Sequence, residues 1–104
     1  MKVEILFPEV CNLYGDLKNA EYLKRGLPQA DFIETALHDD PAFLTEDVDL
    51  LYMGPMTEHT QERIIEKFRP HKERIRHLME SGAVFLFTGN AFEIIGPYIV
   101  NYDF

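Results

Sequence analysis

The 104-residue sequence contains a single cysteine, Cys11, and comparatively few basic residues. With one cysteine, an internal disulfide is impossible and a metal site built from several thiolates is excluded. Ten Lys and Arg residues stand against 18 Asp and Glu residues, which gives a formal net charge of −8 at pH 7. Phosphate groups would be repelled by such a chain, so we expect neither a nucleic acid nor an anionic membrane as its partner.

Long apolar runs, internal repeats and low-complexity segments are also missing. No stretch approaches the roughly 20 apolar residues that a membrane span needs. A strand pattern begins directly at Lys2, so we expect no signal peptide and a cytoplasmic location. The hydrophobic fraction of 46% is enough for a core. The length predicts one small domain over residues 1–104, or a piece of a larger one.

The apolar segments that are present predict an α/β fold. Strands are expected at Lys2–Phe7, Ala30–Leu37, Val48–Met53 and Ala83–Phe87. The last of these is an uninterrupted apolar run, which is typical of a central parallel strand covered on both faces. Strands that alternate with helices predict a parallel sheet with helices on both faces. In such a sheet, ligands bind at the carboxyl ends of the strands.

Helices are expected in the connections between these strands. The first begins at the N-cap Asp16 and ends near Gly26. The second begins at Thr57 or Thr60. Pro70 should break it and start a second piece, because proline suits the first turn of a helix and not its interior. The polar connection before the third strand is either a loop or contains a short helical turn.

Three segments at the expected carboxyl ends resemble class I glutamine amidotransferase domains. Asn12–Leu27, "NLYGDLKNAEYLKRGL", is similar to the opening "NLYGDxGN" of these domains. Asp47–Pro55, "DVDLLYMGP", resembles their "DYDLxxxGGG" strand and turn. Glu80–Gly96, "ESGAVFLFTGNAFEIIG", resembles their "xxGxPxLaICGGYQLLG" strand, elbow and helix. The nearest subgroup contains cobyric acid synthase and the glutamine-hydrolysing subunit of lipid II isoglutaminyl synthase.

The resemblance implies a flavodoxin-like α/β fold and a chemistry that needs neither a metal nor a cofactor. In the family, a cysteine at the elbow attacks the side-chain amide of glutamine, and backbone N–H groups stabilise the oxyanion. A histidine that is oriented by a carboxylate activates the thiol. The ammonia that is released feeds a ligase or synthetase partner.

This sequence departs from the family at the residues that carry the chemistry. The elbow cysteine aligns with Gly89, which is flanked by Thr88 and Asn90. Pro55 stands within the segment that aligns with the Gly-Gly-Gly turn, and proline has no N–H to donate to an oxyanion. We therefore expect a non-catalytic chain. Its turn would be retained because the fold needs the reversal there, and glycine accepts a strained backbone.

The resemblance covers only the first part of a family domain. The family's histidine comes from a segment well after the elbow, so we expect an apparently truncated domain without it. The strand Ala83–Phe87 would then have an unpaired apolar edge, which is an association site. We expect a ligase or synthetase partner, the remainder of a longer polypeptide, or a second copy bound through Tyr98–Phe104, rather than a free monomer.

Eight residues near the expected turns are candidates for a ligand pocket: Tyr14, Asp16, Gly54, Met56, His59, Thr88, Asn90 and Glu93. For Tyr14 and Asp16 the alternative is a bracing role in the first loop, and for Glu93 it is a position on a helix surface.

Three other readings of the chain remain open. Cys11 could be a relocated nucleophile or a packed side chain, and His38–Asp40 could be a metal fragment or a polar connection. The alternative function is an unrelated flavodoxin-like module that binds a phosphate or nucleotide at Gly89–Ala91.

Overall fold

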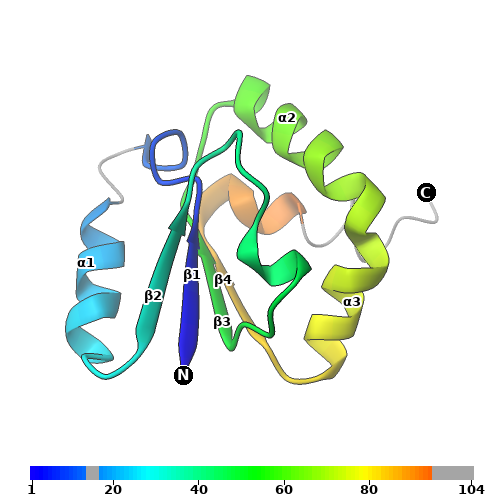
Figure 1. The fold of residues 1–104 in the computed structure, drawn as a ribbon. Coiled ribbons are helices and arrows are strands. Elements are labelled where there is room, and N and C mark those ends of the chain that lie inside the picture. The colour runs from blue at the N-terminus through cyan, green and yellow to red at the C-terminus, as the bar shows by residue number, and fades with distance from the viewer. Residues whose placement is uncertain (14–16, 95–104) are drawn as a thin grey trace.

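The computed structural model describes residues 1–13 and 17–94, and these contain one all-parallel sheet (Figure 1). Its four strands lie in the order β2-β1-β3-β4. Their bounds are Lys2–Leu6 for β1, Asp31–Thr35 for β2, Leu50–Met53 for β3 and Val84–Phe87 for β4. The predicted α/β fold of flavodoxin-like type is confirmed, and each of the four strands is shorter than predicted, most of all β2 and β3.

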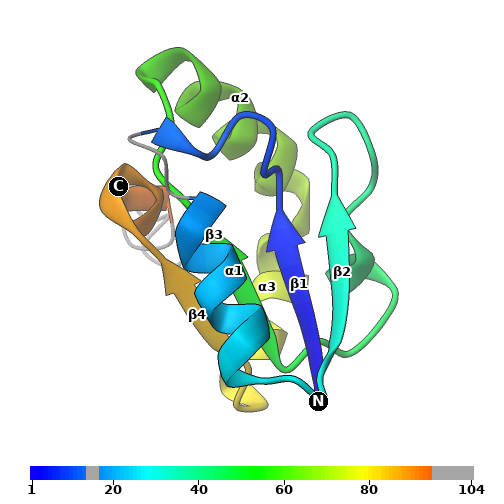
Figure 2. The ribbon, with the colours of Figure 1, turned by 90° about the vertical axis from the view of Figure 1, so that its left-hand side faces the viewer.

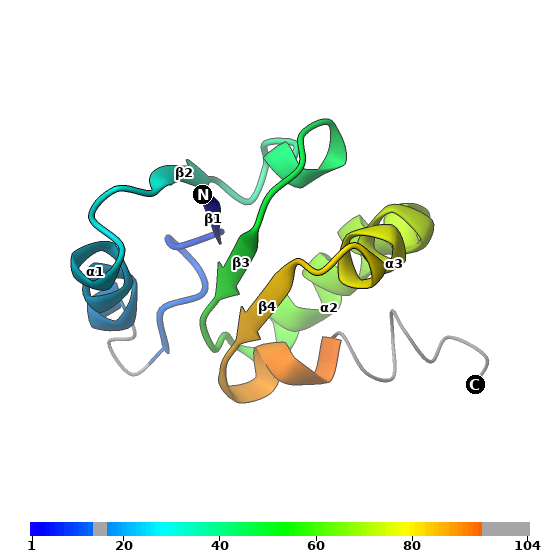
Figure 3. The same ribbon diagram turned by 90° about the horizontal axis from the view of Figure 1, so that it is seen from below.

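Helices cover both faces of the sheet (Figures 2 and 3). Helix α1, Leu17–Gly26, lies on one face, whereas α2, Glu58–Phe68, and α3, Lys72–Glu80, lie on the other. Short 3-10 turns occur at Ala42–Leu44 (η2), Arg69–His71 (η3) and Gly89–Ala91 (η4). None of the helices in the described part of the chain is long and apolar enough to cross a membrane.

The boundaries of α2 follow from local chemistry. The hydroxyl of Thr57 accepts a hydrogen bond from the N–H of Thr60 at 3.2 Å, which caps the first turn. Pro70 lies in η3, between the end of α2 and the start of α3. The predicted break is therefore confirmed. The predicted N-cap Asp16 lies outside the described residues.

Alternating side chains of the strands build two apolar layers. On the α2 and α3 side, residues such as Leu51, Met53 and Phe87 pack with Phe68 and Leu78 in the larger core. On the α1 side, Ile5 and Tyr52 pack with Ala20, and Leu23, Phe32 and Leu50 add to this smaller core. The sheet thus separates a larger apolar core on the α2 and α3 side from a smaller one on the α1 side.

Strand β4 contradicts one expectation, because it lies at an edge of the described sheet and not in its centre. Phe85 and Phe87 contact the larger core, but Val84 and Leu86 are 54% and 41% exposed on the α1 side. Helix α1 packs on β1 and its two neighbours and does not extend over β4. The apolar run therefore predicted correctly that both faces of β4 are apolar. Among the described residues, only the face toward α2 and α3 is covered.

A buried carboxylate fixes the connection between β2 and β3. Glu4 Oε2 accepts hydrogen bonds from Thr35 Oγ1 at 2.5 Å and from the Ala42 N–H at 2.7 Å. Its Oε1 accepts from the Phe43 N–H at 2.9 Å. Glu4 is fully buried within β1, so these three donors replace the water that a carboxylate would otherwise bind. They hold η2 against the sheet.

Candidate functional site

The turn after β4, residues 88–90, lies at the carboxyl edge of the sheet, where the resemblance predicts the elbow, and we call it the elbow turn. The Thr88 N–H donates to the Met53 carbonyl at 3.0 Å, which joins the ends of β3 and β4. Gly89 follows with φ of 57°, in the left-handed region that side chains rarely adopt. The predicted strained reversal is therefore present, and glycine is the residue that accommodates it.

The space above Gly89 is filled by Pro55. A Cβ atom built on Gly89 would lie 2.7 Å from the Cβ of Pro55, much closer than two carbon atoms pack. The proline atom is attached directly to the backbone, so it cannot rotate away. No cysteine or other nucleophilic side chain fits at this position while Pro55 keeps its place.

The side-chain amide of Asn90 binds the backbone of the facing turn. Its Oδ1 accepts from the Met56 N–H at 3.0 Å, and its Nδ2 donates to the Met56 carbonyl at 2.7 Å. Met56 belongs to the segment that aligns with the family's oxyanion turn. Its N–H is therefore already engaged, and Pro55 has no N–H to offer.

Gln61, near the start of α2, forms hydrogen bonds with the elbow turn and with Glu93 beyond it. Its Nε2 donates to the Asn90 carbonyl at 2.9 Å and to Glu93 Oε2 at 3.2 Å. Sequence reasoning missed Gln61, because the contact joins two segments that are 29 positions apart. Only the packing of α2 beside β4 brings them together.

The eight candidate residues fall into three groups: those at or beside the elbow turn, His59 on α2, and two that lie outside the described residues. Gly54 and Met56 are buried, while Thr88 and Asn90 are partly buried around Gly89. Glu93 is exposed and contacts Gln61.

His59 lies apart from this turn. It is exposed in a shallow depression on the outer surface of α2, beside Glu62, Arg63 and Glu66. Tyr14 and Asp16 lie outside the described residues. Four of the eight candidates, Gly54, Met56, Thr88 and Asn90, therefore lie around Gly89, and they fill this place rather than line a pocket there.

The environment of Cys11 does not suit the predicted alternative of a relocated nucleophile. Its side chain is buried in the larger core. Burial, with a smaller contribution from the negative charge of Glu9, raises the pKa of its thiol to about 12. A buried thiol with so high a pKa provides almost no thiolate at neutral pH. Within residues 1–13 and 17–94, no group of three or more His, Cys, Asp or Glu side chains could hold a metal ion.

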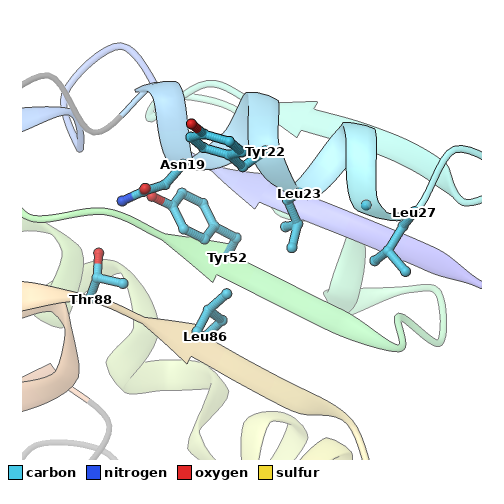
Figure 4. Close-up of a pocket in the computed structure, with 8 residues that line it drawn as sticks. Asn19, Tyr22, Leu23, Leu27, Tyr52, Leu86 and Thr88 are labelled. Carbon is cyan, nitrogen blue, oxygen red and sulfur yellow. The ribbon is translucent and has the colours of Figure 1, made fainter.

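A separate opening runs alongside α1, between this helix and the uncovered face of β4 (Figure 4). It has a volume of about 620 Å³ and a mainly apolar lining, to which α1 contributes Tyr22, Leu23 and Leu27. Tyr52 and Leu86 form the floor, and Asn19 and Thr88 lie at the end nearest the elbow turn. We call this opening the α1–β4 groove. Among the predicted candidates that the structure describes, only Thr88 lines it.

The two features have different chemical capacities. The elbow turn offers no thiol, no space for one and no unoccupied N–H at Met56. The α1–β4 groove has a mainly apolar lining that could receive an apolar group, and the described residues that line it include no acid and base pair. No protein-family model matches the chain, and no curated protein matches it either.

Proposed function

We propose that this chain is a non-catalytic relative of the class I glutamine amidotransferase domains of the cobyric acid synthase and lipid II isoglutaminyl synthase type. In this proposal it acts as a partner-binding or ligand-binding domain, and the partner is a ligase or synthetase. The proposal combines the three sequence segments that resemble the family with the state of the elbow turn.

One observation carries the non-catalytic part of the proposal. Pro55 occupies the volume that a side chain at position 89 would need, with a Cβ-to-Cβ separation of 2.7 Å for any substituted residue. A lost cysteine alone could be restored by one mutation. Here the facing turn has also closed, and Asn90 ties Met56 into that closed arrangement. Two complementary changes support long-standing loss of the reaction.

Retention of the fold favours a binding role. The sheet, the caps and the elbow reversal persist although the nucleophile is absent. A domain that keeps its fold without its catalytic residues is expected to be retained for the surfaces that bind its partner. The apolar face of β4 is such a surface, because Val84 and Leu86 are exposed there.

An assay of ammonia release from glutamine tests the proposal. We expect no turnover above the background from the purified chain, either before or after treatment with a thiol-alkylating reagent. A matched Cys11→Ala variant should behave identically. Turnover that alkylation or Cys11→Ala abolishes would overturn the non-catalytic reading and identify Cys11 as a nucleophile.

A further inference from the structure

The α1–β4 groove combines an uncovered apolar floor with a basic rim. Its floor includes Leu86, and the neighbouring Val84 extends the apolar surface along the same face of β4. Tyr22 rises from α1 and is 70% exposed, although it belongs to the groove lining. A soluble chain seldom leaves such side chains grouped on one face without a partner.

The uncovered strip beside α1 has room for no more than one helix. Neighbouring strands lie about 4.8 Å apart, so the four-stranded sheet is about 14 Å wide between its outer strands. A packed helix has a diameter of about 10 Å with its side chains. Helix α1 contacts residues of β1, β2 and β3. Two helices side by side need about 20 Å, so one further helix beside α1 would rest on β4 and extend past the edge of the sheet.

The charges beside the groove determine which kind of helix fits. Helix α1 carries Lys18, Lys24 and Arg25 against the single acidic residue Glu21, in a chain whose formal net charge is −8. Lys24 pairs with Glu34 of β2. Lys18 and Arg25 lie on either side of Tyr22 along the helix, are exposed, and form no ion pair with another described residue. Glu21 lies beside them, so this part of the rim carries one more positive than negative charge. An acidic helix would complement this rim.

We propose that the α1–β4 groove binds an amphipathic helix of a partner protein, with an apolar stripe on Leu86 and acidic side chains toward Lys18 and Arg25. The proposal rests on the partner-binding role given above, but it does not depend on the loss of glutaminase activity. A second copy of this chain is a poorer occupant. Its own α1 would bring the same positive charges to the rim, and like charges across an interface are unfavourable.

A pair of designed peptides tests the groove directly. Each is a fluorescent helix of about 18 residues, long enough to hold helical structure, with Leu at alternating three- and four-residue spacing. One carries Glu at the flanking positions and the other carries Lys. We expect the acidic peptide to bind the full chain saturably in fluorescence anisotropy and the basic peptide to bind at least about fivefold more weakly.

Variants of the chain then locate the site. Leu86→Glu should weaken binding of the acidic peptide by about tenfold or more, because it places a charge against the apolar stripe. Val84→Glu serves as a second variant, and both positions are exposed, so folding should be retained. Reversal of the rim by Lys18→Glu with Arg25→Glu should remove the preference for the acidic peptide. Phe92→Glu is the matched control, since Phe92 is 71% exposed but does not line the groove.

Three outcomes would overturn the proposal. One is no saturable binding of the acidic peptide at millimolar concentration. Another is equal binding of both peptides, or binding that Leu86→Glu leaves unchanged. The third is a dimer in sedimentation experiments that Leu86→Glu dissociates, because a second copy would then cover the groove. Glutaminase activity of the chain would contradict the proposed function and leave this binding test unaffected.

Discussion

Pro55 and Gly89 occupy one shared space at the carboxyl edge of the sheet. The Cβ of Pro55 lies where a side chain at position 89 would begin, so each residue restricts what the other can be. In the family that the sequence resembles, these two positions serve the oxyanion turn and the nucleophile. Because of this pair, a single Gly89→Cys substitution would place the new side chain against Pro55.

The first prediction concerns this pair. Gly89→Cys should lower the free energy of unfolding by about 2–5 kcal/mol. Two costs add: a residue with a side chain is strained in the left-handed region, and its Cβ would overlap Pro55. Pro55→Gly in the same chain should recover the part due to the contact, whereas Pro55→Ala should not, since alanine keeps the Cβ. Urea denaturation of the single and double variants measures the coupling.

Gly82 provides the control for backbone strain alone. It has φ of 101°, and no atom would lie within 4 Å of an added Cβ. Gly82→Ala should therefore cost about 1–2 kcal/mol and show no coupling to Pro55→Gly. Equal recovery by Pro55→Ala and Pro55→Gly would show that the Cβ contact is not the cause.

A second prediction concerns the clasp between Asn90 and Met56. Asn90→Ala removes both side-chain hydrogen bonds and leaves the backbone of the buried Met56 without them. We expect a loss of about 1–3 kcal/mol in the free energy of unfolding. The Met56 amide should also exchange its hydrogen faster than in the unmodified chain.

Gln61→Ala separates the clasp from its outer support, because Gln61 contacts Asn90 only through the carbonyl oxygen. Its effect on Met56 exchange should be much smaller. Unchanged exchange in Asn90→Ala would mean that water or another group satisfies Met56 equally well.

A third prediction concerns Glu4. Its carboxylate accepts from three donors, and glutamine would turn an NH₂ group toward at least one of them. Glu4→Gln should therefore lower the free energy of unfolding by about 2–3 kcal/mol although it is nearly isosteric. Glu34→Gln is the matched control. Glu34 is exposed beside Lys24, and this change should stay within about 0.5 kcal/mol. Equal effects of the two variants in urea denaturation would contradict the role given to Glu4.

The fourth prediction concerns the pH dependence that Cys11 produces. Burial raises the pKa of its thiol from 9.0 to about 12, so folding favours the protonated form. The resulting stability is fully present below pH 9 and is lost as the pH rises from about 9 to about 12. Cys11→Ala should remove this part of the alkaline decline in unfolding free energy.

Alkylation provides an independent measurement of the same environment. At pH 8 the folded chain should react with iodoacetamide at least about a hundredfold more slowly than the chain in urea. Rapid alkylation of the folded chain would show that Cys11 is accessible as a thiolate.

Local sequence determined the elements and several of their ends. Thr57 caps α2, Pro70 separates α2 from α3, and Gly89 takes the left-handed conformation after β4. These features depend on the backbone preferences of a few neighbouring residues, so a sequence pattern is enough to predict them. The alternation of strands and helices was sufficient for the parallel sheet in the same way.

Tertiary structure decided which apolar side chains the elements leave exposed and which turns contact each other. The apolar pattern of β4 could not indicate that α1 stops short of Val84 and Leu86, because coverage depends on where a distant helix packs. The contact between Pro55 and Gly89, and the bonds from Asn90 to Met56, join turns that are about 34 positions apart. Such contacts depend on the register of β3 and β4 in the sheet, so only the folded chain could show that Pro55 fills the space next to Gly89.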